Sequence, residues 1–399
     1  MKLGYARLLA GSIVFWTAAR AQSPVLSLAE AQQTALRNHP QIASATFEAQ
    51  ASGFAIREAR SAYYPTLAGN ITGVGTEHGS VLSAGAVTTS SIYSRGATGI
   101  VANQLVTDFG RTGSLVETAK LRSAARNENV IDTRAQALVE VQQAYYQALA
   151  AQAIRKVAQA TLDLRRLTLR QVTALADSAL RSKLDVSFAE VTVSQAQLDL
   201  IHAENDARAS HARLSAAMGY ERDQSFTLAD EALPSPLSQD VDGLIAAAMH
   251  DRPDLGTVRL NRDSLHSYAE AEKKLRNPTV NAAAVAGVAP VRDERLPESY
   301  SAAGINVNIP VLNGGLFKAR REEAESHASA ADKDVQALVA EANEALRLAQ
   351  ARYENALGSI VELNQAQVNQ TAAEIAAASA KYEYLSRRAD LNYAIGALR

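Results

Sequence analysis

The sequence has no cysteine and few aromatic residues (5%), and it has no glycine or proline between Gly113 and Gly219. Without cysteine there are no disulfides, no cysteine-ligated zinc site and no thiol for bacterial lipid attachment. The 105 residues between those two glycines lack the residues that most penalise helix interiors. They predict a long helical hairpin with its turn at residues 176–183. A helix over residues 114–176 would be about 95 Å long, so it must project and bury its apolar stripe against other helices.

Long hydrophobic runs are also missing, and the net charge is only −2. Residues 1–21 combine a basic start, an apolar stretch over residues 8–19 and the ending Ala19-Arg20-Ala21. This pattern is typical of a secretory signal peptide cut before Gln22; the alternatives are a retained anchor or a buried helix. No later stretch approaches 18 unbroken apolar residues, so any membrane crossing is expected to use β-strands. We expect export to the periplasm, the exterior or an outer membrane, and no nucleic-acid partner.

Sequence motifs of common enzymes are absent. The seven histidines include no His-Glu-x-x-His pair, and there is no Gly-x-Ser-x-Gly elbow and no phosphate loop. Gly73-Val74-Gly75 lacks the third glycine of a nucleotide site and is interpreted as strand packing. His202 and His211 are predicted to be solvated residues on a helix surface. We expect no catalytic residues, no cofactor-binding residues and no metal ligands, and therefore no enzyme.

Five short landmarks recur in the same order in the two halves of the chain, which indicates a tandem duplication. The paired landmarks are Arg37-Asn38-His39-Pro40-Gln41-Ile42 with Asp251-Arg252-Pro253-Asp254-Leu255, Tyr64-Pro65 with Asn277-Pro278, Val106-Thr107-Asp108-Phe109-Gly110 with Val311-Leu312-Asn313-Gly314-Gly315, Ser182-Lys183-Leu184-Asp185-Val186 with Ser359-Ile360-Val361-Glu362-Leu363, and Ala217-Met218-Gly219 with Ala394-Ile395-Gly396. We predict a first repeat over residues 22–219, a linker or equatorial segment over 220–242, and a second repeat over 243–399.

Each repeat is predicted to run helix, strand, loop, strand, long helix, turn, helix. The predicted strands lie at about 64–75, 91–106, 278–289 and 300–311, and the predicted helical hairpins at 112–219 and 314–398. The clearest strand is the last, where Ile305, Val307 and Ile309 alternate with polar residues and proline. These three residues are predicted to face lipid. The alanine-rich strand from Val280 has the weakest alternation.

Alternating strands of about ten residues separated by polar loops are what a transmembrane β-barrel requires. Four strands cannot close a barrel with an open interior, but three chains supplying four strands each could, and a threefold assembly would also bury the strand edges. The predicted fold is therefore mainly α with a β-barrel portion. The alternative is a soluble four-stranded sheet capped by helices.

Turn residues are expected where strands give way to helices. Asp108 and Asn313 carry side-chain oxygens able to cap the first free amides, and Gly110, Gly314 and Gly315 permit a sharp turn. On the long helix a packed stripe is predicted for Leu138, Val141, Tyr145 and Leu149.

A duplicated chain with these landmarks resembles the TolC-like outer-membrane efflux and secretion channels over nearly all of its mature length. The residues that carry the resemblance are Arg37-Asn38-His39-Pro40, Arg252-Pro253-Asp254-Leu255, Leu184-Asp185-Val186 with Ala189-Glu190, the glycines after the second and fourth strands, and Tyr382-Glu383-Tyr384-Leu385 leading into Ala394-Ile395-Gly396-Ala397-Leu398.

The resemblance implies a homotrimer in the outer membrane of a Gram-negative bacterium, with a 12-stranded barrel continued by a 12-helix tunnel through the periplasm. It implies a passive exit duct of a tripartite efflux pump or type I secretion system. Such a duct opens when a periplasmic adaptor (membrane fusion) protein and an inner-membrane transporter of the RND, ABC or MFS type dock. The partners are then these two proteins and outer-membrane lipid.

The resemblance also places the family's gate at the hairpin turns. The acidic gate position falls on Glu362, a second acidic position is Gln365 here, and the first-repeat equivalents are Asp185 and Phe188. Three Glu362 carboxylates would ring the tunnel and favour cations, so Glu362→Gln should lower cation selectivity. The alternative is that Glu362 is an ordinary solvated acid at a helix start.

The chain departs from the family pattern at the hairpins. The usual tip glycine is Ala179 and Ala356 here, and the second descending helix is 28 residues shorter than the first when counted from Gly110 and Gly315. Two further interpretations therefore stay open: a periplasmic coiled-coil adaptor or scaffold without a barrel, and a degenerate channel that folds but does not conduct.

Overall fold

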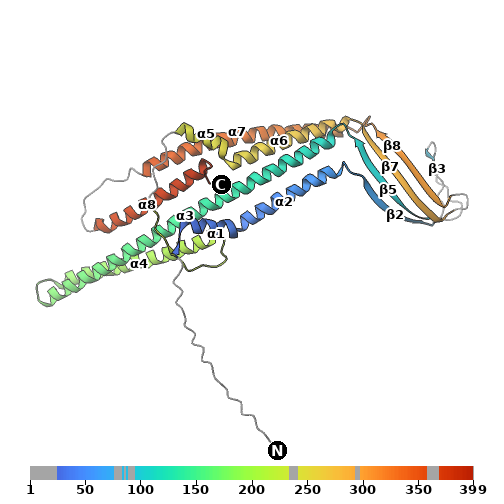
Figure 1. Ribbon diagram of the computed structural model, residues 1–399. Helices are drawn as coiled ribbons and strands as arrows, with labels where there is room; N and C mark the ends of the chain where they lie inside the picture. Colours follow the sequence, from blue (N-terminus) through green and yellow to red (C-terminus); the bar gives the residue numbers. More distant parts are fainter. Residues whose placement is uncertain are drawn as a thin grey trace, which may run out of the picture.

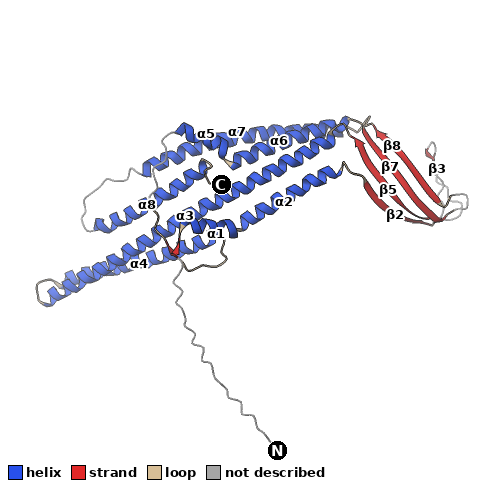
Figure 2. Ribbon diagram, viewed as in Figure 1, coloured by secondary structure: helices blue, strands red, loops and turns tan. Residues whose placement is uncertain are grey.

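The computed structural model describes residues 25–75, 83–84, 87–88, 95–232, 241–292, 297–356 and 368–398. The described chain is elongated: long helices run alongside one another, and a four-stranded sheet lies at one end of them (Figure 1, Figure 2). Among the described helices, none combines the length and the apolarity needed to cross a membrane.

The helices of the first repeat begin where the sequence provides a start signal. α1 (Leu28–Asn38) opens with a capping box, in which the side chains of Ser27 and Glu30 each accept the other's backbone N–H. α2 (Pro40–Ser61) opens with proline, which is tolerated there because the first N–H of a helix has no partner in the helix.

The predicted long helical hairpin is present. α3 (Arg111–Asp177) has 67 residues, which is about 100 Å at 1.5 Å per residue, and α4 (Lys183–Ala217) returns beside it. No helix of this length can be enclosed by a single domain core, so its packing faces are distributed along its whole length.

The second repeat follows the same order with shorter parts. Its helices are α5 (Val241–Asp251), α6 (Pro253–Lys273), the 3-10 turn η1 (Lys274–Arg276), α7 (Leu316–Ala356) and α8 (Val368–Ala394). α6 begins with proline, as α2 does. α7 has 41 residues against the 67 of α3, so it is about 39 Å shorter.

Two strands from each repeat form one antiparallel sheet in the order β2-β5-β7-β8. The strands are β2 (Thr66–Val74), β5 (Arg95–Thr107), β7 (Thr279–Val291) and β8 (Ser299–Asn308). β7, predicted to be the weakest, has 13 residues and pairs with both of its neighbours, β5 and β8. The fold class is confirmed as mainly helical with a sheet built from both repeats, and a single chain does not close that sheet into a barrel.

Two small sheets were not predicted. β1 (Val25–Leu26) pairs in parallel with β6 (Thr227–Leu228), which joins the start of the first repeat to the linker. β3 (Ser83–Ala84) and β4 (Val87–Thr88) pair within the predicted loop between β2 and β5.

The main core lies where α1, α3, α4, α8 and β6 meet. The predicted stripe on α3 is buried there, with Val141 and Tyr145 fully inaccessible. Small residues contribute much of this core, because alanine lets long helices approach closely. The buried alanines of the core are Ala31, Ala35, Ala144, Ala148 and Ala217.

Two of the repeated landmarks meet in space, and they do so in both repeats. Gly219, just past α4, has φ +81 and lies against the joint between α1 and α2, where an added Cβ would be 2.7 Å from the carbonyl oxygen of Asn38. Gly396, just past α8, has φ +74 and lies in the same way against the joint between α5 and α6, where an added Cβ would be 2.8 Å from the carbonyl carbon of Asp251. Only glycine fits both the backbone conformation and the close approach.

Candidate functional site

The register of the sheet places most of its large apolar side chains on one face. Paired residues of an antiparallel sheet point to the same side, and Leu67 and Ile71 of β2 pair with Ala102 and Thr98 of β5. By the same register this apolar face also carries Ile100, Val280, Val288, Ile305 and Val307. It is open to solvent in the single chain, where Ile71 is 91% exposed.

Two of the three residues predicted to face lipid lie within β8. Ile305 and Val307 lie on the apolar face of β8 and are 73% and 55% exposed. Ile309 is also exposed, but β8 ends at Asn308, so the strand is shorter than predicted. Pro310, which has no N–H for a ladder bond, follows directly.

The opposite face of the sheet is more polar. Thr66 and Asn103 pair across β2 and β5, and Asn281 and Asn306 pair across β7 and β8. The ring of Tyr300 lies across two further strands on this face. A Cβ at Gly99 or at Gly287 would collide with that ring, and the Tyr300 hydroxyl donates to the carbonyl of Thr98 at 3.4 Å. The two glycines thus allow the aromatic ring to lie flat on the sheet.

The two edges of the sheet are open. Within the described residues β2 pairs only with β5 and β8 only with β7. Because each neighbouring pair is antiparallel, β2 and β8 run in opposite directions. Each edge therefore presents backbone N–H and C=O groups that an antiparallel strand from another chain can bond.

Asp108 caps the long helix, as its position predicted. Its carboxylate accepts the N–H of Thr112 at 2.7 Å and the Thr112 hydroxyl at 2.6 Å, and it also accepts the N–H of Gly110 at 3.1 Å. Gly110 has φ +90, a conformation that glycine adopts without strain. Lys274 of the second repeat donates to the Gly110 carbonyl at 3.2 Å, which fastens this turn to the other half of the chain.

The matching turn of the second repeat uses two glycines. Gly314 and Gly315 have φ +62 and +84, and α7 begins at Leu316. The Leu316 N–H donates to the carbonyl of Asn313 at 3.2 Å. The expected sharp turn is therefore present, while capping by the Asn313 side chain stays a prediction.

At the hairpin turn, Asp185 has a structural task. Its carboxylate accepts the N–H of Ser182 at 3.1 Å, and the Ser182 hydroxyl accepts the N–H of Asp185 at 3.2 Å, so the pair is a capping box that starts α4. Phe188 lies one turn later and is 63% exposed. Glu362 and Gln365 lie outside the described residues. The gate role of these four positions stays a prediction.

The turn itself ends α3 with a Schellman motif. The N–H of Ala179 donates to Ala176 at 3.0 Å, and the N–H of Leu180 donates to Leu175 at 2.9 Å. Ala179 has φ +53, the left-handed conformation that favours glycine at this position. The alanine found there is strained by about 1 kcal/mol.

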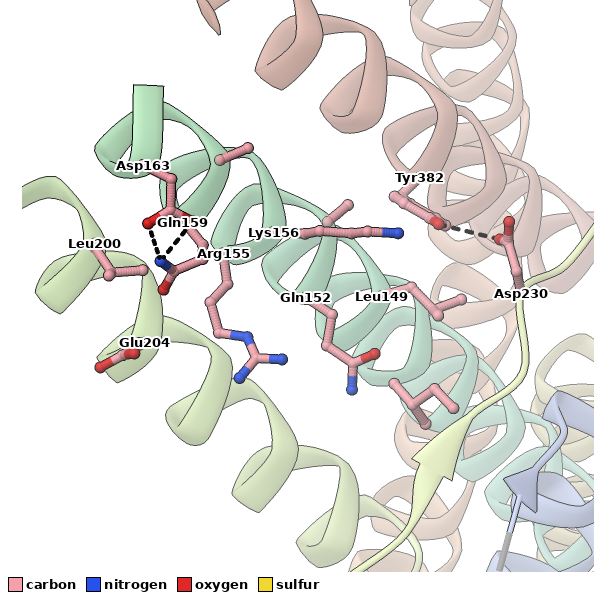
Figure 3. Close-up of a pocket in the computed structure, with 13 residues that line it drawn as sticks. Leu149, Gln152, Arg155, Lys156, Gln159, Asp163, Leu200, Glu204, Asp230 and Tyr382 are labelled. Carbon is pink, nitrogen blue, oxygen red and sulfur yellow. Dashed lines mark hydrogen bonds between the residues drawn. The ribbon is translucent and has the colours of Figure 1, made fainter. Parts of the chain in front are cut away.

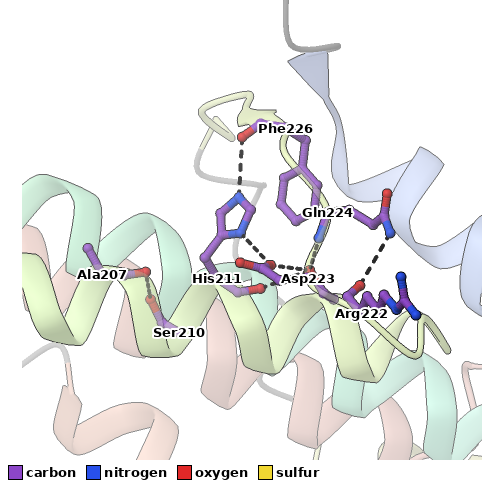
Figure 4. Close-up of polar contacts among 8 residues, drawn as sticks. Ala207, Ser210, His211, Arg222, Asp223, Gln224 and Phe226 are labelled. Atoms are coloured by element: carbon purple, nitrogen blue, oxygen red, sulfur yellow. Dashed lines mark hydrogen bonds and ion pairs between the residues drawn. The ribbon is translucent and has the colours of Figure 1, made fainter.

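The linker after α4 folds back over that helix (Figure 4). The ring of His211 stacks on Phe226 with centroids 4.0 Å apart, and its Nδ1 lies 3.1 Å from Asp223, which also accepts the Ser215 hydroxyl at 2.9 Å. Burial raises the pKa of Asp223, but the hydrogen bonds from Ser215 and His211 outweigh it and lower that pKa. The prediction that His211 is solvated was wrong, because the linker covers it; His202 is exposed.

Tyr145 of α3 makes hydrogen bonds to the same linker. Its hydroxyl lies 2.9 Å from the carbonyl of Leu26 and 2.7 Å from that of Ala229, and the Ala229 N–H donates to Leu26 at 2.9 Å. Burial raises the pKa of Tyr145, so the hydroxyl stays a donor. The α3 stripe that contains Tyr145 was predicted to serve packing alone. The signal in the sequence was the tyrosine itself, because a tyrosine buried among leucine and valine needs a hydrogen-bond acceptor for its hydroxyl.

A groove of about 690 Å³ runs between α3, α4, α8 and the linker (Figure 3). Its lining mixes charges, with Arg155 and Lys156 near Glu204 and Asp230, and it contains no histidine, serine or threonine. Tyr382 donates to Asp230 at 3.1 Å, and burial followed by that bond raises the pKa of Tyr382 to about 12.

A half-buried charge cluster joins both repeats near the second glycine joint. Arg252 and Asp254, at the start of α6, are ion-paired at 2.5 Å, and Tyr393 of α8 donates to Asp132 of α3 at 3.2 Å. Burial, and next the charge of Asp254, raise the pKa of Asp132. Within the described residues no group of three or more histidine or acidic side chains could hold a metal ion.

The sequence matches known outer-membrane proteins. A family model described as outer membrane efflux protein matches residues 31–220. The outer membrane efflux protein BepC of Brucella suis biovar 1 (strain 1330) is 22% identical over 308 residues, which cover 76% of this chain and 64% of BepC. The match thus spans less than two thirds of that relative.

The fold matches solved outer-membrane proteins over nearly the whole chain. VceC of Vibrio cholerae superposes with a TM-score of 0.71 at 16% identity, covering 92% of this chain and 96% of VceC. The CmeC outer membrane channel of Campylobacter jejuni superposes with a TM-score of 0.74 at 15% identity, covering 99% and 94%. These matches confirm the predicted resemblance in fold, and the family match confirms it in the sequence of the first half.

Proposed function

Since this chain has the fold of the TolC-like outer-membrane channels, we propose that three copies form a passive duct from the periplasm to the exterior. The duct is the outer-membrane part of a tripartite efflux pump or type I secretion system. The fold itself belongs to channel proteins and not to enzymes. The observation that carries the proposal is the sheet, which has one exposed apolar face and two open edges.

In an assembly of three copies every edge strand can pair with a strand of another copy. β8 of one protomer runs opposite to β2, so β8 can pair with β2 of the next protomer and keep every pair antiparallel. Three chains with four strands each then give a closed sheet of twelve. Closure removes every free edge, which an open sheet of exposed apolar strands cannot do.

The two faces support the same assembly. Lipid is a suitable environment for the apolar face with Ile71, Ile305 and Val307, which is largely exposed in the single chain. The polar face with Thr66, Asn281 and Asn306 then lines the interior. β5 and β7 have 13 residues each. This is long enough, because a tilted strand needs roughly 9–11 residues to cross a bilayer.

The helices continue the duct on the periplasmic side, because both long helices start directly after a strand through tight glycine turns. In this arrangement a periplasmic adaptor and an inner-membrane transporter supply opening and energy. The alternative of an adaptor or scaffold without a barrel leaves the apolar face and both sheet edges uncovered.

Two neighbouring substitutions on β2 test the barrel. Ile71→Lys puts a charge on the apolar face near the middle of the strand, and Thr72→Lys puts the same charge on the polar face. In lipid the first costs about 2–4 kcal/mol and prevents assembly in the outer membrane. The second leaves a trimer and shifts its selectivity towards anions.

The measurements are outer-membrane fractionation, heat-modifiable trimer on gels and conductance in planar bilayers. The proposal predicts a conducting trimer for the wild-type protein and a difference between the two lysine variants. A soluble monomer in the periplasmic extract would refute the barrel and support the scaffold interpretation. An outer-membrane trimer without conductance would instead support the degenerate channel.

A further inference from the structure

The two helical hairpins differ in reach. The second, from Leu316 to Ala394, has 28 fewer residues than the first, from Arg111 to Ala217. The described helices differ accordingly: α7 has 26 fewer residues than α3, and α8 has eight fewer than α4. Figure 1 shows the α3–α4 turn lying beyond α7 and α8. We call residues 164–196 of the first hairpin the projecting tip.

Each helix of the projecting tip carries an apolar row at three- and four-residue spacing, as in a coiled coil. The α3 seam consists of Leu164, Leu167, Gln171 and Leu175, and the α4 seam of Leu184, Phe188, Val191 and Gln195. All eight residues are exposed in the single chain, and the leucine, phenylalanine and valine side chains are 41–66% exposed. Exposed rows in which three of four residues are large and apolar are normally covered in an assembled protein.

The two seams face away from each other. α3 and α4 pack together through Leu162 on one side and Ala196 and Leu200 on the other. Leu164 lies two residues from Leu162, which is about 200° around the helix. Leu198, which continues the α4 seam, likewise lies two residues from Ala196 and therefore about 200° around α4 from it. The hairpin therefore cannot cover its own seams.

The seams match in height. Counted from the helix ends at Asp177 and Lys183, Gln171 lies six residues from the turn and Phe188 five. The other pairs agree within two residues. These pairs are Leu175 with Leu184, Leu167 with Val191, and Leu164 with Gln195. Each α3 seam residue thus has an α4 seam residue at its own level.

Charge favours contact between unlike helices. From residue 155 to 177, α3 carries five lysines or arginines and two acids, whereas α4 from 184 to 206 carries five acids and no lysine or arginine. Two α3 helices side by side, or two α4 helices, would bring like charges together. A ring that alternates α3 and α4 brings unlike charges together at every contact.

We propose that the next copy of this chain covers these seams: in the trimer, the α4 seam of each protomer packs against the α3 seam of its neighbour. The three projecting tips then close into a ring of six helices beyond the twelve-helix part of the tunnel. This inference rests on the trimer of the proposed function. It makes the first hairpins alone the constriction at the periplasmic end, and opening the duct requires these seams to part.

Cysteine cross-linking tests the contact, and the natural chain has no cysteine to interfere. The variant Gln171→Cys with Phe188→Cys places one thiol on each seam at the same level. The control, Gln171→Cys with Asn205→Cys, keeps the second thiol on the continuation of the α4 seam but moves it 17 residues, about 26 Å, away. Within one chain the seams lie on opposite sides of the hairpin, too far apart for a disulfide, which needs Cα atoms within about 7 Å.

Oxidation of the purified detergent-solubilised trimer should convert the first variant to a covalent trimer on non-reducing gels and leave the control and both single-cysteine variants unlinked. Leu167→Cys with Val191→Cys is a second pair that must also link. Two outcomes overturn the inference: neither pair links although light scattering shows a trimer, or the control links equally well. The first outcome means that the α3 and α4 seams do not meet in the trimer, and the proposed function stands. If light scattering shows no trimer, the proposed function fails as well.

Discussion

Gly219→Ala should destabilise the protein because Gly219 closes the joint between α1, α2 and α4. The glycine has φ +81, and a Cβ there would lie 2.7 Å from the carbonyl oxygen of Asn38 and 3.0 Å from the backbone nitrogen of His39. These are backbone atoms, so they cannot rotate out of the way as a side chain could. The joint itself must open to admit a methyl group.

The magnitude follows from two contributions. Alanine in the left-handed conformation costs about 1 kcal/mol relative to glycine. Forcing a methyl group into a closely packed contact typically costs about 1–3 kcal/mol. We therefore expect a loss of about 2–4 kcal/mol in the free energy of unfolding. Gly396→Ala should cost a similar amount, because φ is +74 and the added Cβ would lie 2.8 Å from the backbone carbonyl carbon of Asp251 at the second joint.

The assay is the denaturant midpoint of the helical circular-dichroism signal, compared at equal protein concentration because the proposed assembly is a trimer. Gly53→Ala is the matched control. Gly53 lies inside α2 with nothing within 4 Å of an added Cβ, so alanine should stabilise by about 0.5–1 kcal/mol. If Gly219→Ala moves the midpoint in the same direction as Gly53→Ala, the close approach at this joint does not exist in solution.

Three further variants probe single interactions. Asp132→Asn removes a carboxylate whose pKa in the folded protein is raised by burial and by the charge of Asp254. Because that pKa lies above the unfolded value of 3.8, the folded wild-type protein binds a proton more readily than the unfolded chain does. The wild type therefore gains stability as the pH falls towards 3.8. The variant should be more stable at neutral pH and lose this advantage near pH 4, and an equal advantage at both pH values would contradict the assignment. Ala179→Gly relieves the left-handed alanine at the hairpin turn and should stabilise the protein by about 0.5 kcal/mol after the entropy cost of glycine, which raises the thermal midpoint. A lower midpoint would show that φ is negative there. Tyr145→Phe should cost about 1–2 kcal/mol and speed hydrogen exchange of the Ala229 amide, whereas unchanged exchange would show that the hydroxyl does not hold the linker.

Much of the architecture was predictable because it depends on local sequence. The absence of glycine and proline over 105 residues predicts the α3–α4 hairpin, since no other residues break a helix as strongly. Period-two alternation predicts which faces of β2 and β8 are apolar. Asp108 followed by Gly110 predicts how the long helix starts. Each of these signals acts within a few residues along the chain.

The candidate site was less predictable, because its contacts join distant segments. Nothing near His211 in the sequence indicates that Phe226 will stack on it. The two-residue strands β1 and β6 are too short to show alternation, and the Tyr145 hydroxyl that bonds the carbonyls of Leu26 and Ala229 comes from a helix distant in the sequence. The end of β8 at Asn308 also became clear only from the strand pairing.

By itself, the sequence determined that the chain is a duplication of a strand pair with a helical hairpin, because repetition, periodicity and helix-breaking residues are encoded locally. Only the tertiary structure decided that the recurring glycines close the recurring proline joints, that the strands of both repeats share one open-edged sheet, and that the α3 and α4 seams point outward at matching heights. These features depend on how helices of unequal length pack over tens of ångströms, and packing at that distance is set by which faces meet in three dimensions.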